Sequence, residues 1–240
     1  AGLRLEGRQV RAVRLAGGEE IPCSGLVSTA PLTGLVGMLD GQAPPEVRDA
    51  AAQLRFRSFL VVAAVLDQRD LFADQWIYIH SPEVKIGRIQ NVGNWSRRMV
   101  PDPGTTVLGV EYFCDEGDAF WRCSDAYLAR FAEEELRILE LIAPATRVID
   151  SCVARVPKAY PLYSPGYSLN LRIIRGYLQS LANVQVAGRG GMFKYNNMDH
   201  SILTGILAAR NLLGGREDVW GINTEDEYHE TVREPRDDAR

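Results

Sequence analysis

The stretch that decides the fold runs from residue 184 to residue 201 and reads VQVAGRGGMFKYNNMDHS. It opens with a short apolar run, passes through glycines at 188, 190 and 191, and leads into an amphipathic helix predicted over residues 199–213. Glycines let a backbone approach a ligand closely, and a helix N-terminus suits a negatively charged group because its first amides are free. A glycine pattern alone is weak, so both a ligand-binding turn and an ordinary strand–turn–helix connection remain open.

The remainder of the chain has the composition of a globular protein. Its 240 residues are enough for one large domain or two small ones, with 46% hydrophobic and 24% charged residues. The formal net charge is -4 and no run of lysine and arginine occurs, so we expect no nucleic-acid partner.

The four cysteines, at positions 23, 114, 123 and 152, form no CxxC pair. We therefore expect no metal site, and reduced thiols in a cytoplasmic protein. The longest apolar run, residues 59–66, is far shorter than the roughly 20 residues that span a bilayer, so no transmembrane segment is expected. The N-terminus has neither Met nor the apolar core of a signal peptide, and it predicts a chain that begins inside a longer protein.

Hydrophobic patterning predicts strands broken by Gly and Pro, with a few helices between them. The expected strands cover residues 3–15 (a hairpin turning at Glu6-Gly7), 25–31, 59–66, 76–80, 85–91, 105–113, 148–156 and 184–187. The expected helices cover residues 32–39, 46–54, 124–142, 170–181 and 199–213. Ser124 is placed to cap the clearest helix, and the chain after Gly215 is polar and aperiodic, which predicts a poorly packed tail.

The deciding stretch resembles the C-terminal FAD-contact motif of the amine oxidase/protoporphyrinogen oxidase/UDP-galactopyranose mutase superfamily. Gly188-Arg189, Tyr195-Asn196-Asn197 and Asp199-His200-Ser201 are similar to the oxidoreductase branch. The triplet Phe193-Lys194-Tyr195 and the pair Met198-Asp199 resemble the mutase branch, although Asn197 stands where mutases usually carry an acid.

Three further segments, residues 25–31, 111–118 and 155–163, are similar to other parts of these enzymes, so the resemblance covers roughly residues 25–214. It implies an α/β to α+β fold: the C-terminal portion of a Rossmann-like FAD domain with an inserted mixed or antiparallel sheet-plus-helix substrate domain. The expected division is residues 1–40 and 166–215 in the FAD domain, 41–165 in the inserted domain and 216–240 in the polar tail.

One departure from the superfamily is large. The GxGxxG motif that cradles the FAD pyrophosphate occurs nowhere in this sequence, and the acid that grips the adenosine ribose is also missing. We therefore expect the N-terminal FAD-binding half to be missing from this chain, which would not be a complete enzyme of the superfamily. FAD is expected in the full-length protein, with weak or absent binding and no activity in this chain alone.

The resemblance also implies site residues. Those expected to border the cofactor are Ala30, Pro31, Gly188, Arg189, Tyr195, Asn196, Asn197, Met198 and Asp199. Lys194, Tyr160 and Tyr163 are expected to contact a small-molecule substrate. Catalytic residues remain unknown, because no nucleophile–base pair is visible and the flavin does the redox chemistry in such enzymes.

Three functions remain open at this stage. The first is a flavin-dependent oxidoreductase acting on a small molecule, which Asn196-Asn197 favours. The second is an isomerase resembling UDP-galactopyranose mutase. The third is a non-catalytic remnant that binds a partner through its former FAD face, and a homodimer is one way to cover that face.

Overall fold

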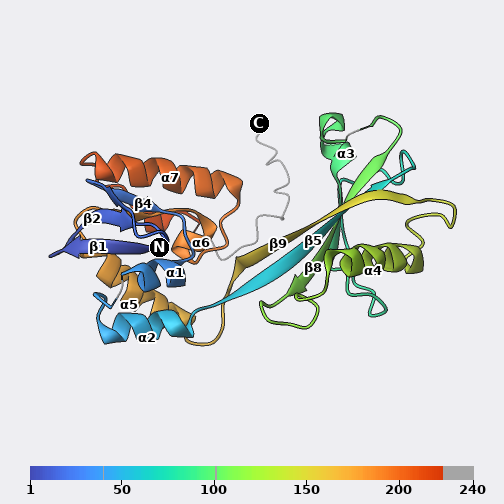
Figure 1. Cartoon of the computed structure of the whole chain (residues 1–240). Coiled ribbons are helices and arrows are strands. Elements are labelled where there is room, and N and C mark those ends of the chain that lie inside the picture. Colours follow the sequence, from blue (N-terminus) through green and yellow to red (C-terminus); the bar gives the residue numbers. More distant parts are fainter. Residues whose placement is uncertain (40, 101, 224–240) are drawn as a thin grey trace, which may run out of the picture. The chain divides into compact units, whose positions relative to one another are not determined.

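The computed structural model describes residues 1–39, 41–100 and 102–223, and its architecture is mixed α/β (Figure 1). The chain forms two compact units, one made of residues 1–54 with the chain from Tyr163 onward, the other of Arg55–Leu162. Within the described residues, no helix is both long and apolar enough to cross a membrane.

The first unit begins with a three-stranded antiparallel sheet of β1 (Gly2–Glu6), β2 (Gln9–Arg14) and β3 (Glu20–Pro22). The turn expected at Glu6-Gly7 is present, and Gly7 adopts a φ of 62° that suits glycine. Asn183 ties this sheet to the rest of the unit, because its side chain accepts from the Val10 amide and donates to the Val10 and Ser24 carbonyls.

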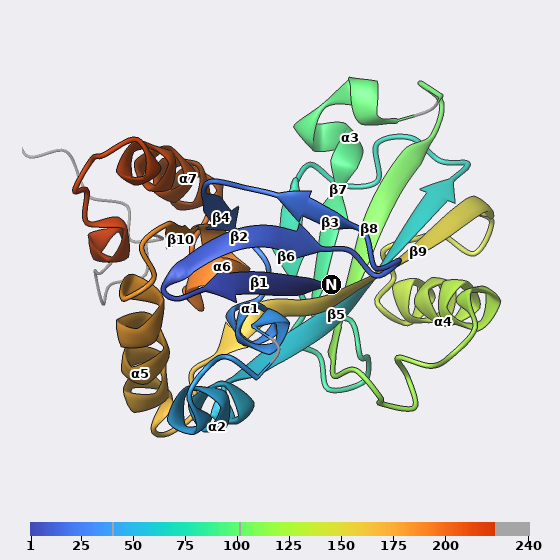
Figure 2. The ribbon, with the colours of Figure 1, turned by 60° about the vertical axis from the view of Figure 1, so that its left-hand side comes forward.

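A short parallel pair lies at the centre of the first unit: β4 (Leu26–Ser28) beside β10 (Val184–Val186). The helices of this unit are α1 (Leu32–Met38), α2 (Pro45–Gln53), α5 (Tyr167–Gln179), α6 (Gly188–Met192) and α7 (Met198–Leu212). Helices α2 and α5 pack side by side (Figure 2), and α7 packs on β10.

Residues 216–223, for which little apolar burial was expected, contain one buried apolar side chain. A short 3-10 helix, η2 (Val219–Gly221), forms there, and the Val219 side chain is buried. The side chain of Asp218 accepts a hydrogen bond from the Trp220 amide and so caps this turn, a local signal inside a polar composition. Residues 224–240 of the expected tail lie outside the described residues.

The second unit is built on a five-stranded antiparallel sheet in the order β6-β7-β8-β5-β9. Its strands are β5 (Arg55–Leu66), β6 (Trp76–Tyr78), β7 (Arg88–Asn91), β8 (Thr106–Cys114) and β9 (Val148–Leu162). Strand β9 continues six residues past the expected end at Val156, through Pro157 and Pro161. It tolerates these prolines because it lies at the edge of the sheet.

One face of this sheet packs against α4 (Asp125–Ile138), which presents Leu128, Ala132 and Leu136 to the core. Ser124 caps the helix as expected, since its hydroxyl accepts from the Tyr127 amide at 3.3 Å. The helix stops short of the expected residue 142 because Glu140 adopts a left-handed φ of 55°. Two short turns, α3 (Val92–Trp95) and η1 (Arg97–Met99), complete the unit.

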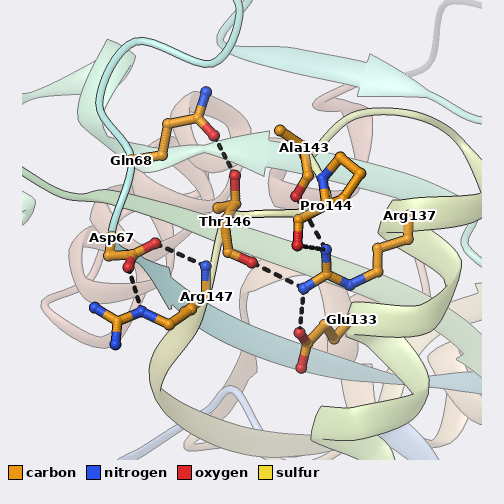
Figure 3. A network of polar contacts seen from close by, with 8 residues as sticks. All are labelled: Asp67, Gln68, Glu133, Arg137, Ala143, Pro144, Thr146 and Arg147. Atoms are coloured by element: carbon orange, nitrogen blue, oxygen red, sulfur yellow. Dashed lines mark hydrogen bonds and ion pairs between the residues drawn. The ribbon is translucent and has the colours of Figure 1, made fainter.

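Arg137 organises the connection between α4 and β9 (Figure 3). Its guanidinium donates to the carbonyls of Ala143 (3.0 Å), Pro144 (3.3 Å) and Thr146 (2.8 Å), and it pairs with Glu133 at 2.6 Å. Arginine suits this task because its planar fork carries five donors. The connection is therefore held by side-chain bonds where no regular structure satisfies its carbonyls.

A buried carboxylate makes the stability of the second unit depend on pH. Glu135 is 4% exposed, and its side chain accepts from the Lys85 amide at 2.5 Å. Burial raises the pKa of Glu135 above its ordinary value, although the Lys85 amide acts in the opposite direction. Because the folded state binds the proton more tightly than the unfolded state, Glu135 favours folding at acid pH and this contribution is lost as pH rises through the folded pKa.

We therefore expect Glu135→Gln to make the chain more stable than wild type at pH 7, by about 1.4 kcal/mol for each unit of the pKa shift that it removes. The difference should shrink toward pH 4, because glutamine keeps the acceptor and cannot ionise. Denaturant unfolding between pH 4 and pH 8 measures this. Glu134→Gln, at an exposed position of the same helix, is the control; a variant that tracks wild type at every pH would contradict the prediction.

Candidate functional site

The glycine segment after β10 forms the short helix α6, where a turn was expected from the sequence. Gly188 enters it with a φ of 77°, a conformation that favours glycine. The Gly188 amide donates to the Thr204 hydroxyl at 3.0 Å, so this amide is already used by α7 within the same unit.

Gly191 permits the tightest backbone packing at the site. A Cβ atom placed on it would lie 2.7 Å from the Ser28 carbonyl oxygen and 3.2 Å from Thr29 Cα. At Gly190 an added Cβ would make only ordinary contacts, 3.6 Å from the Thr29 carbonyl oxygen and from Pro31 Cα. Gly191 thus lets α6 approach the backbone of its own chain, a role that the sequence pattern did not distinguish from close approach to a ligand.

Ala30 and Pro31, two of the residues expected to border the cofactor, lie on the link from β4 to α1. The Pro31 carbonyl accepts from the amides of Gly34 and Leu35 and so begins α1. Because β4 and β10 are parallel, the segments that follow them leave from the same sheet edge. The structure thus brings Pro31 close to Gly190, two residues after Gly188.

Phe193 reverses the chain after α6. It adopts a left-handed φ of 50° and its side chain is fully buried. Its ring centroid lies 6.1 Å from that of Tyr163 and 6.2 Å from that of Tyr167, and the two tyrosine rings stack at 4.5 Å. Tight packing of the buried ring compensates the strained backbone of this bulky residue. The left-handed conformation of Phe193 ends α6, and the loop of residues 194–197 follows.

Arg189 contacts two residues of the loop that follows Phe193. The Arg189 Nε donates to the Asn196 carbonyl at 2.8 Å, and the guanidinium carbon lies 5.7 Å from the Tyr195 ring centroid. Asn196 is buried, whereas Tyr195 is 41% exposed. The Tyr195 amide donates to the Tyr163 hydroxyl at 3.0 Å, which links an expected substrate residue to an expected cofactor residue.

Asn197 stands at the start of α7, and its backbone amide donates to His200 Nδ1 at 3.2 Å. His200 is therefore a helix-start residue, with Asp199 Oδ1 3.5 Å from the same ring nitrogen. Met198 and Asp199 are both exposed at this helix end. The first turn of α7 is therefore exposed, which the sequence motif did not indicate.

Lys194 has partners that the sequence did not indicate. Its Nζ donates to the carbonyls of Trp220 at 2.8 Å and Ile222 at 2.6 Å. Burial lowers the pKa of Lys194, with the nearby Arg175 charge acting in the same direction. An ammonium has three donors, so these two bonds leave at most one for a substrate.

Tyr160 belongs to the second unit, on β9, where its hydroxyl accepts from Arg88 at 2.6 Å. Arg88 also donates to Glu111 through Nε at 2.7 Å, and both members of this ion pair are buried. The guanidinium faces the rings of Trp76 and Phe113, at 5.1 and 4.9 Å from their centroids. Sequence reasoning missed this pair, for which the signal was a charged residue inside an otherwise apolar strand.

Comparisons with solved structures give the fold a context. The chain superposes on reduced UDP-galactopyranose mutase with a TM-score of 0.74 at 22% identity, covering 85% of this chain and 44% of the other. A putative protoporphyrinogen oxidase from Exiguobacterium sp. 255-15 gives 0.59 at 18% identity, with 80% and 42% covered. An oxidoreductase from Methanosarcina mazei gives 0.52 at 12% identity, with 79% and 43% covered.

The chain thus has a fold similar to part of these proteins, and it spans less than half of their length. No family model matches the sequence. No curated protein matches it either.

We expect Gly191→Ala to destabilise the first unit by about 1–3 kcal/mol, because the added methyl meets backbone that cannot rotate away. Gly205→Ala is the matched control: it lies within α7 with open space around it, and alanine should be neutral there or stabilise by about 0.5–1 kcal/mol. Thermal unfolding of both variants measures the difference. Equal stability of the two variants would show that the contact at Gly191 relaxes freely.

Proposed function

We propose that this chain is the C-terminal part of an FAD-dependent oxidoreductase that oxidises a small molecule. The observation that carries the proposal is the meeting of residues 29–31 and 188–191 at the carboxyl ends of two parallel strands. Ligands of open α/β sheets bind at such ends. The similarity of fold to UDP-galactopyranose mutase and to a putative protoporphyrinogen oxidase, at low identity, is compatible with this placement.

The chemistry of this edge suits the flavin side of FAD. Tyr195 offers an exposed ring, and the first turn of a 15-residue helix offers amides and a partial positive charge for a ring that becomes anionic on reduction. We propose that Ala30, Pro31, Gly188, Arg189, Tyr195, Asn196, Asn197, Met198 and Asp199 border the cofactor. When bound, FAD would accept the electrons of the substrate, while these residues would position it.

The second unit is proposed as the inserted substrate domain, with the first unit as the end of a Rossmann-like FAD domain. Tyr160 and Tyr163 are proposed substrate contacts, together with the remaining donor of Lys194. We also propose a cytoplasmic protein, because Cys23, Cys114, Cys123 and Cys152 are all free thiols.

We propose that an N-terminal FAD-binding half covers an apolar face of the first unit. Met198, Ile202 and Ile206 follow one another at four-residue spacing along α7 and are 80%, 59% and 47% exposed. The Leu26 amide and the Ser28 carbonyl bond toward β10, so the backbone groups of Val27 point to the opposite edge of β4. A parallel strand supplied by the N-terminal half would bond to this edge of β4, and the helix that follows such a strand would cover the apolar side chains of α7.

A second candidate is a flavin-dependent isomerase acting on a sugar nucleotide. The superposition of 0.74 on UDP-galactopyranose mutase favours it. The absorption spectrum of the purified complete protein tests both candidates, since both need bound flavin. Reduction of that flavin by a substrate supports the oxidoreductase; binding of a UDP-sugar without net oxidation supports the isomerase. A complete protein without flavin contradicts both.

We expect the 240-residue chain alone to bind FAD weakly or not at all. The pyrophosphate cradle and the ribose acid contribute several charge-assisted hydrogen bonds of about 1.5–3 kcal/mol each, so their loss lowers the affinity by several orders of magnitude. Titration of the purified chain with FAD, followed by flavin fluorescence, measures this. Saturable quenching at low micromolar FAD would contradict the prediction. Light scattering of the same sample measures whether the chain is a dimer, as expected if a second copy covers the apolar face.

A further inference from the structure

Residues 217–223, here named the C-terminal strap, fold back onto the first unit. Glu217 and Asn211 bond reciprocally: the Glu217 amide donates to Asn211 Oδ1 at 2.7 Å, and Asn211 Nδ2 donates to the Glu217 carbonyl at 2.9 Å. Further along, the Trp220 ring lies 5.1 Å from the Arg175 guanidinium on α5. The strap is therefore fixed to both α7 and α5.

Three consecutive loop residues bond to this strap. Lys194 Nζ donates to the Trp220 and Ile222 carbonyls, as described above. Asn223 Nδ2 donates to the Tyr195 carbonyl at 3.1 Å and to Asn196 Oδ1 at 3.2 Å. The loop from Lys194 to Asn196 is thus bonded to a segment that lies 26 to 28 residues further along the chain.

The Lys194 ammonium is a charged group whose hydrogen bonds to the strap are made to backbone carbonyls and not to a carboxylate. It donates to two uncharged carbonyls, and the side chain is only partly exposed. A buried ammonium is costly unless its donors are satisfied. The strap supplies two acceptors that the loop itself does not, which couples the position of the loop to the presence of the strap.

We propose that the C-terminal strap is a latch that sets the conformation of residues 194–197, and that Lys194 is a positioning residue acting through the Trp220 and Ile222 carbonyls. The inference rests on the proposed function in one respect, namely that this loop borders the flavin. When the strap is bound to the loop (latch closed), the Tyr195 amide donates to the Tyr163 hydroxyl and Asn196 is buried. With the latch open, the loop loses its outer contacts before any ligand is present.

Hydrogen exchange on the 240-residue chain tests the latch without any cofactor. The reporters are the amides of Tyr195 and Asn196, which donate to the Tyr163 hydroxyl and to the Lys194 carbonyl. Lys194→Met keeps the apolar stem and removes the donors, so we expect exchange at these amides to become roughly tenfold faster or more. A chain ending at Gly215 should show the same local increase, and the two changes together should add nothing further.

Matched variants separate the latch from general destabilisation. Lys194→Arg keeps donors for both carbonyls and should restore slow exchange, whereas Lys158→Met, at an exposed position of the second unit, should change nothing. The amides of the β1–β2 pair, which belong to the same unit as Lys194, serve as an internal check that this unit is folded in each variant. Unchanged exchange at Tyr195 and Asn196 in folded Lys194→Met would overturn the proposal.

A second measurement separates the latch from the proposed function. In the complete protein, Lys194→Met should weaken FAD binding roughly tenfold, as measured by release of flavin on dilution, and Lys194→Arg should bind nearly as wild type. Faster exchange in the chain with no flavin in the complete protein would keep the latch and reject the function. Faster exchange with unaltered flavin affinity would reject the link between the loop and the cofactor.

Discussion

The parallel pairing of Leu26–Ser28 with Val184–Val186 is the constraint on which the first unit depends. Two three-residue strands from opposite ends of the chain must align in one register before α6 can lie against residues 28–31. The contact that follows is so close that position 191 has no room for a side chain. Asn183, one residue before β10, secures the register by bonding to Val10 and Ser24.

The elements with strong local signals were predicted from the sequence. The hairpin turn at Gly7, the cap at Ser124 and the apolar strand expected over residues 59–66 are determined by nearby residues, so they are present, although the strand begins earlier, at Arg55. Boundaries set by tertiary structure were missed. Strand β9 passes through two prolines because, among the described residues, it is the edge strand of its sheet. No local sequence pattern indicates that a strand lies at an edge.

In the candidate site, too, some residues had a sequence signal and others depend on tertiary structure. A motif brought Arg189, Tyr195 and Asn196 to attention, and their mutual contacts are consistent with a single small site. The partners of Lys194 were not foreseeable, because carbonyl acceptors carry no sequence signal and residues 220–222 lie in a segment of polar composition. The buried pair Arg88–Glu111 depends on the register between β7 and β8, which only the folded sheet shows.

The register of β5 and β9 has a consequence for modularity. Arg55 pairs with Leu162, and these are the first and last residues of the second unit. The unit therefore enters and leaves its sheet at neighbouring positions, about one strand spacing apart. A segment whose two ends already meet can be gained, lost or exchanged during evolution with little loop-closure cost. The same geometry allows the sheet-and-helix unit to diversify while the glycine-lined strand edge of the first unit stays unchanged.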